Sequence, residues 1–253
     1  MSFLDFLLLA AAGFFSGALN AVAGGGTFFT FAALMAAGLP PITANASSAV
    51  ALTVASTASA AAYRREIARF WRGALWLTLA SGTGALIGAL ILVALSNQSF
   101  RALVPYIMLF ATLVFALGPR IARFAGMEAA ELPTQRRRLA GLVSQFLISV
   151  YGGFFGAGMG ILMLASLSLT ENIDYHRINA IKQILAIAIQ GVAIVVFIRG
   201  GIIDWPAALT VMAAAILGGY LGVGLARRVP SQTMRAIVVA AGAALTIYYF
   251  VSG

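Results

Sequence analysis

Long apolar stretches, separated by short breaks that carry charge, proline or glycine, run through the whole chain. Most of them are long enough to cross a bilayer as a helix, which needs roughly 20 mostly apolar residues. Two stretches, 27–38 and 160–171, are too short to cross and are typical of re-entrant or broken helices. The sequence therefore predicts an all-α polytopic membrane protein. Its expected helices cover 3–23, 27–38, 42–63, 73–95, 100–117, 139–157, 160–171, 174–198, 205–226 and 233–250.

Composition excludes an ordinary soluble domain. Apolar residues make up 62% of the 253 residues and charged residues only 9%, whereas a soluble domain carries about 25% charged residues. A soluble protein of this size would lack the polar side chains needed to cover its surface, so we expect a lipid bilayer as its solvent. The absence of cysteine excludes disulfides, thiolate metal sites and a cysteine nucleophile. The apolar N-terminus has no basic flank, which predicts a retained helix rather than a cleaved signal peptide.

An internal repeat divides the chain, because its halves align without a gap at an offset of 134 residues. The alignment predicts a first membrane repeat over 1–117, a linker over 118–138 and a second membrane repeat over 139–253. Each repeat is expected to hold a hairpin with a short broken or re-entrant helix, followed by three spanning helices. The alignment pairs Gly24 with Gly158 and Gly26 with Gly160. The matches that chance explains least are Asn45 with Asn179, Trp71 with Trp205, Gln98 with Gln232, and Arg101 with Arg235.

The net charge of +9 comes from arginine clusters between apolar stretches, which fits the positive-inside rule better than nucleic-acid binding. The rule places the loop 64–72 and the linker 118–138 in the cytoplasm. The loop 199–204 is equivalent to 64–72 but carries only Arg199 and Asp204, so it is expected outside. Equivalent loops then lie on opposite sides, which predicts inverted-topology repeats with both termini external. We expect this architecture, common in secondary transporters, in a bacterial inner membrane.

The segment from Asn20 to Thr27 is the first candidate site, because three consecutive glycines destabilise a helix by roughly 1 kcal/mol each relative to alanine. A break at membrane depth is tolerated only where protein or a watery cavity satisfies the freed backbone groups. The next helix then starts with free N–H groups that suit an anion. Close packing is the alternative, which we favour for Gly84 with Gly88 and Gly218 with Gly222. The candidates at the two breaks are Asn20, Gly24, Gly25, Gly26, Thr27, Gly158 and Gly160.

Polar residues in the expected helices 42–63 and 174–198 form the second candidate site. Lys182 stands about two turns inside its helix, and a charge at that depth is a functional hypothesis by default. The alternative is that Lys182 extends to the interface. For the hydroxyl groups, the alternative is interhelical hydrogen bonding worth about 0.6 kcal/mol. The candidate substrate-binding residues in these helices are Asn45, Ser48, Asn179, Lys182 and Gln183.

Motifs for enzyme chemistry are missing from the sequence. His176 is the single histidine, so a histidine metal cluster is impossible, and its neighbours Glu171, Asp174 and Arg177 favour a surface ion pair over a proton relay. There is no phosphate-binding loop, no serine-nucleophile motif and no pair of carboxylates spaced for acid–base catalysis. We therefore expect no enzyme activity, no cofactor and no metal site.

Three segments of the first half carry a family resemblance: Asn20-Ala-Val-Ala-Gly-Gly-Gly-Thr27, Gly38-Leu-Pro-Pro-Ile-Thr-Ala-Asn-Ala46 and Tyr63-Arg-Arg65. Together with Arg177-Ile-Asn-Ala180 in the second half, they resemble the sulfite exporter TauE/SafE family over nearly the whole chain. The resemblance implies a membrane permease for small sulfur-containing anions, such as sulfite or sulfoacetate, or for related organic anions. The run Gly158-Met-Gly160 departs from the longer glycine run expected there. The family's motifs fall on Asn20, Gly24 to Gly26, Asn45, Gly158, Gly160 and Asn179.

These observations predict a secondary transporter of small anions, with H⁺ or Na⁺ as the coupling ion. Two alternatives stay open at this point: a gated anion channel and a non-transporting integral membrane subunit. The glycine pairs can pack within one chain or between chains, so a homo-oligomer also stays open. Neither the substrate nor the direction of transport follows from the residues.

Overall fold

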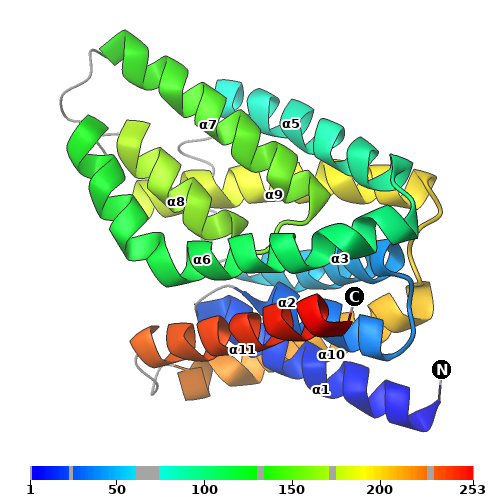
Figure 1. Ribbon diagram of the computed structural model, residues 1–253. Coiled ribbons are helices and arrows are strands. Elements are labelled where there is room, and N and C mark those ends of the chain that lie inside the picture. The colour runs from blue at the N-terminus through cyan, green and yellow to red at the C-terminus, as the bar shows by residue number, and fades with distance from the viewer. Residues whose placement is uncertain are drawn as a thin grey trace.

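The computed structural model describes residues 2–22, 25–60, 74–129, 134–170, 175–226 and 231–252. Every regular element within these ranges is a helix, and no strand occurs in them (Figure 1). The helices are α1 (Phe3–Val22), α2 (Gly26–Ala36), α3 (Pro41–Ala60), α5 (Leu75–Ala94), α6 (Asn97–Ala129), α7 (Thr134–Phe154), α8 (Met159–Thr170), α9 (Tyr175–Arg199), α10 (Trp205–Ala226) and α11 (Ser231–Ser252).

Helix α6 is the one element whose length differs clearly from expectation. The predicted helix 100–117 continues to Ala129, and α7 starts at Thr134, so helix occupies most of the predicted linker 118–138. Gly118 and Pro119, which suggested an end, lie inside α6. Proline is tolerated within membrane helices where neighbouring groups satisfy the freed carbonyl. The residues that follow are mostly good helix formers such as arginine and alanine.

The two short helices are present as predicted. Helix α2 has 11 residues and α8 has 12, so each is about 17 Å long at 1.5 Å per residue. That length is little more than half of a hydrocarbon core of about 30 Å. Neither α2 nor α8 can cross a bilayer alone.

Four helical stretches in the described residues are long and apolar enough to cross a membrane: Phe3–Asn20, Leu75–Ala94, Asn97–Gly118 and Ile181–Arg199. Large apolar side chains also cover the outer surface, including Trp76 at 74% exposure and Val251 at 83%. Such a surface is unfavourable in water but suits lipid. The chain is therefore an integral membrane protein.

Helices from the two halves pack on one another in matching pairs. Helix α1 packs chiefly on α10, and α7 chiefly on α5 (Figure 1). Helix α3 packs on α10, and α9 packs on α5. The offset of 134 residues relates α1 to α7, α5 to α10 and α3 to α9, so each pair corresponds to another when the halves are exchanged. The halves are therefore interleaved rather than separate.

Glycines make the closest of these helix pairs possible. A β-carbon at Gly84 would lie 2.6 Å from the carbonyl oxygen of Phe146 in α7. A side chain at Gly88 would collide with the carbonyl of Val150, and one at Gly218 with that of Phe14. Backbones that approach this closely need small residues between them. This confirms the packing interpretation for these glycines; the surroundings of Gly222 lie outside the described part of the chain.

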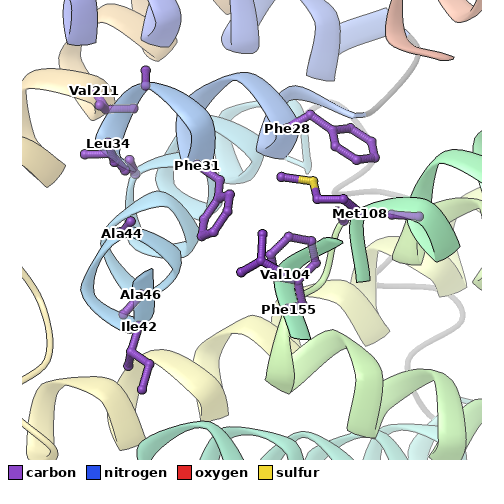
Figure 2. Packing of buried hydrophobic residues seen from close by; sticks show 14 of the residues in the cluster. Phe28, Phe31, Leu34, Ile42, Ala44, Ala46, Val104, Met108, Phe155 and Val211 are labelled. Carbon is purple, nitrogen blue, oxygen red and sulfur yellow. The ribbon is translucent and has the colours of Figure 1, made fainter. Parts of the chain in front are cut away.

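The main apolar core lies where α2 faces α6 and the end of α7, and Figure 2 shows ten of its residues with labels. Phe31 of α2 packs edge to face on Phe155, which directly follows α7, with ring centroids 5.4 Å apart. Val104 and Met108 of α6 are fully buried beside these rings. This core holds α2 against the connection between α7 and α8.

One apolar pocket of about 670 Å³ lies between α1, α2 and α11. Alanines and aromatic rings line it, among them Phe29, Ala33, Ala244, Tyr248 and Tyr249. Across the molecule, α8 packs extensively on α6, whereas the equivalent helices α2 and α11 make little contact. The two halves therefore differ in this contact, although the repeat relates α2–α11 to α8–α6.

Candidate functional site

The first glycine break separates α1 from α2 and is held by side chains of α1. Gly25 has a φ of +90°, in the left-handed region that glycine adopts without steric cost. The backbone N–H of Gly26 donates to Asn20 Oδ1 at 3.2 Å. Ser16 Oγ donates to the carbonyl of Gly26 at 2.9 Å. The start of α2 is thereby fixed to the end of α1; Gly24 lies outside the described residues.

Space, as well as backbone conformation, requires glycine at this break. A β-carbon at Gly26 would lie 2.5 Å from the carbonyl oxygen of Ser16. One at Gly25 would lie 2.7 Å from Val238 of α11 and 2.8 Å from the ring of Phe115 in α6. Distances under 3.0 Å leave no room for a side chain without movement of the surrounding atoms.

The second glycine break lies between α7 and α8 and has the same character. Gly156 and Gly158 have φ angles of +80° and +76°. The Tyr151 hydroxyl donates to the carbonyl of Ala157 at 2.6 Å, which fixes the connection. Gly160, in the first turn of α8, differs from the others because a β-carbon there would meet no atom within 4 Å. Open space therefore lies beside the start of α8.

The ring of Phe115 joins the two breaks. It lies 2.8 Å from the β-carbon position of Gly25 and 3.2 Å from that of Gly158. It also packs edge to face on Phe28 of α2, with ring centroids 5.7 Å apart. Sequence reasoning missed this residue, although the repeat pairs Phe115 with Tyr249, and two aromatics in equivalent positions were a usable signal. The breaks of the two halves meet at one ring that is 2% exposed.

Asn45 of α3 connects the first half to the second break. Its side chain is 2% exposed, and Nδ2 donates to the carbonyl of Phe154, the last residue of α7, at 2.9 Å. The Oδ1 atom is buried, and no donor reaches it from the described residues. The equivalent Asn179 lies in α9, but its side-chain surroundings are outside the described part of the structure.

The hydroxyls of α3 bind neighbouring helices. Ser48 is fully buried, and its Oγ shares a hydrogen bond of 2.5 Å with Thr30 Oγ1 of α2. Ser47 Oγ accepts the backbone N–H of Asp204 at 3.0 Å. The Ser48–Thr30 bond is an interhelical bond of the alternative interpretation, and the Ser47 bond ties α3 to the residue that precedes α10. Thr27, in contrast, is half-buried in the first turn of α2 and stands at the break itself.

Lys182 and Gln183 lie on α9, nearer its start than Gln190, which stands beside the second break. Both are half-buried on α9, and Lys182 has no ion pair or hydrogen bond within the described residues. Gln190 of the same helix marks the level of the second break, since its Nε2 is 3.6 Å from the β-carbon position of Gly156. Lys182 comes eight residues earlier, which is about 12 Å along the helix axis. The structure thus brings Asn20, Gly25, Gly26 and Gly158 together, and Lys182 precedes Gln190 by about two turns of α9.

Comparisons with known proteins cover almost the whole chain. A family model described as sulfite exporter TauE/SafE matches residues 9–249. A protein of Haemophilus influenzae named "Probable membrane transporter protein" is 28% identical over 92% of this chain and 89% of its own length. "Probable membrane transporter protein ORF9" of Sinorhizobium sp is 25% identical over 96% and 91%. "Probable membrane transporter protein YfcA" of Escherichia coli K12 is 23% identical over 91% and 84%. No solved structure matches the chain.

Proposed function

Because this chain belongs to the sulfite exporter TauE/SafE family of membrane transporters, we propose that it is a permease for small anions. Sulfur-containing anions such as sulfite and sulfoacetate are the first candidates. The observation that carries the proposal is the meeting of two glycine breaks at Phe115. Each break is followed by the N-terminus of a short helix, where backbone N–H groups and the helix dipole favour negative charge.

The start of α8 offers the better position for an anion. Gly160 has open space beside it, and the connection 155–158 before α8 holds two glycines. At the start of α2, the half-buried Thr27 adds a hydroxyl donor close to the break. Asn20 Oδ1 already accepts the N–H of Gly26, so the role of Asn20 is to position α2.

Lys182 serves a different part of the proposed path. Its half-buried ammonium group has no counter-ion among the described residues, and a cation in that setting attracts anions more strongly than an exposed one. Lying about 12 Å along the axis from the level of the break, it would draw an anion toward the site together with Gln183. We assign Lys182 to the path and the glycine breaks to the binding position.

The matching helix pairs support inverted-topology repeats as the transport architecture. The pairs α1–α10 and α7–α5 exchange when the halves are exchanged, as expected when two equivalent units enclose a central site. With inverted repeats, 118–138 would be cytoplasmic and both termini external in a bacterial inner membrane. Transport would be driven by an ion gradient through H⁺ or Na⁺.

Flux measurements in liposomes test this proposal. The purified chain is reconstituted, and uptake of sulfite, sulfoacetate, sulfate, taurine and simple carboxylates is measured against concentration. Saturable uptake of one anion class is expected. Uptake that rises linearly without saturation would indicate a gated channel, and no uptake of any anion by folded protein would contradict anion transport and favour a non-transporting subunit.

A matched pair of substitutions locates the site in the same assay. Gly160→Leu fills the space beside the start of α8, whereas Gly191→Leu fills equally open space on α9. Both changes introduce one leucine into a helix where no atom lies within 4 Å of the new β-carbon. We expect Gly160→Leu to lose most of the uptake and Gly191→Leu to retain it. Equal uptake by the two variants would remove the start of α8 from the site.

A further inference from the structure

The buried carboxamide of Asn45 has an acceptor atom that the fold leaves unused. Its Nδ2 donates to the carbonyl of Phe154, while Oδ1 has no hydrogen-bond partner within the described residues. The orientation is not arbitrary, because a carbonyl only accepts and must face Nδ2 rather than Oδ1. A buried acceptor without a partner is costly and calls for a bound water or ion as its explanation.

The Asn45 carboxamide lies at the C-terminal end of α7, and this end of the helix carries negative potential. Phe154 ends α7, and the C-terminal end of a helix bears the negative end of its dipole. The backbone N–H groups of Phe155 and Gly156 both donate to the backbone carbonyl of Tyr151. Within the described residues, the carbonyls of Gly152 and Gly153 accept no hydrogen bond from the connection that follows. An anion is therefore disfavoured at this end, and a cation is favoured.

We infer that the C-terminal end of α7 and Asn45 Oδ1 form a binding site for a monovalent cation, with Na⁺ as the first candidate. The groups available are neutral oxygens, a carboxamide and helix carbonyls, with no carboxylate among them. Neutral oxygens at the ends of interrupted helices are the usual ligands of Na⁺ in transporters. Divalent cations generally need carboxylates.

This inference deepens the proposed function and rests on it. The second break would then present two ends of opposite sign, the negative end of α7 to the cation and the positive start of α8 to the anion. A cation bound at the end of α7 would favour an anion at α8, and the anion would favour the cation by the same factor. Asn45 would thereby couple the two ligands, which differs from the direct anion contact expected from its sequence position.

Cation binding by the purified protein is the first test, because it needs no knowledge of the anion. Thermal unfolding is measured in NaCl, KCl and choline chloride at equal ionic strength, together with direct binding of ²²Na⁺ to the unmodified chain. We expect saturable ²²Na⁺ binding and a rise in Tm of about 5 °C at saturating Na⁺ relative to choline. Equal Tm in all three salts, with no ²²Na⁺ binding, would overturn the inference.

Two substitutions in α3 assign the site. Asn45→Ala removes Oδ1 and one part-buried hydrogen bond, that to Phe154 of α7. Ser47→Ala removes only a part-buried hydrogen bond, that to Asp204 just before α10. The Na⁺ response is expected to vanish in Asn45→Ala and persist in Ser47→Ala. A full Na⁺ response in Asn45→Ala would overturn the assignment. If Asn45→Ala does not fold, ²²Na⁺ binding to the unmodified chain still decides whether a site exists.

Uptake in liposomes separates failure of the cation site from failure of the permease. Replacing external Na⁺ by choline should lower saturable anion uptake about tenfold, within the usual range of coupling between two sites. Anion uptake that is unchanged in choline would retain the permease and reject the cation site. ²²Na⁺ binding without uptake of any anion would retain the cation site and reject the anion permease.

Discussion

Two contacts that the internal repeat relates to each other are built differently. Helix α8 packs extensively on α6, whereas α2 and α11 are parted by a pocket of about 670 Å³. The residues explain much of the difference. The pocket has Ala12, Ala33, Ala241 and Ala244, and the equivalent positions hold Phe146, Leu167, Ile107 and Phe110.

The comparison indicates that the small side chains at these four positions contribute to the pocket. Some lining positions run the other way, since Leu245 and Tyr248 at the pocket correspond to Ala111 and Val114. The lining is almost entirely apolar, so it offers nothing to an anion. We therefore place the transport path at the glycine breaks and regard the α2–α11 pocket as a lipid-facing region of low packing density.

The largest effect is expected from disrupting the close α1–α10 helix pair. Gly218→Ala puts a β-carbon into the carbonyl of Phe14 and forces α10 away from α1, which should cost about 3 kcal/mol or more. The neighbouring Gly219→Ala meets its nearest atom at 3.7 Å and serves as the control. Yield and Tm in detergent measure both. Equal Tm for the two variants would contradict the tight α1–α10 contact.

A substitution in α8 makes the α8–α6 region resemble the α2–α11 region. Leu167 of α8 is 1% exposed, and Leu167→Ala installs the residue found at the equivalent Ala33. The new cavity should lower stability by about 2–5 kcal/mol. Leu245→Ala, at the edge of the existing pocket, should cost clearly less because its side chain is only half-buried. Thermal unfolding of both variants measures the two losses. A larger loss in Leu245→Ala than in Leu167→Ala would contradict the packing difference.

The two breaks also differ in how the following helix is held. Asn20 accepts the N–H of Gly26, but its equivalent in the second half is Phe154, which has no polar side chain. Asn20→Ala should lower stability by about 1 kcal/mol and reduce anion uptake by misplacing α2. Tm and initial uptake rates measure the two effects. Unchanged uptake would restrict Asn20 to a structural role.

The smallest effect is expected from filling the pocket. Ala244→Phe introduces the residue of the equivalent Phe110 and should raise stability by up to about 1 kcal/mol through new apolar contact. Uptake should stay within about twofold, because the pocket lies off the proposed path. Loss of uptake in a folded Ala244→Phe variant would show instead that the pocket must close during transport.

Most of the fold follows from apolar run lengths, because a membrane helix must satisfy its own backbone and spans a fixed thickness. The end of α6 was misplaced since Pro119 reads as a helix end by local rules. The glycine breaks were visible in the sequence, but their meeting at Phe115 depends on tertiary packing. The neighbour of the second break on α9 was equally hidden, because the sequence does not tell that Gln190 is the residue beside Gly156.

The α1–α10 pair has a consequence for folding during synthesis. Helix α1 leaves the ribosome well before α10, yet its glycines fit that later helix, which starts only at Trp205. Until then, Gly13 and Gly17 must rest against lipid or a temporary neighbour, and α3 waits for the same partner. A chain terminated before Trp205 would leave both helices without their main packing partner. We expect such truncated products to be removed by membrane proteases, so that a duplicated protein cannot survive as its first half.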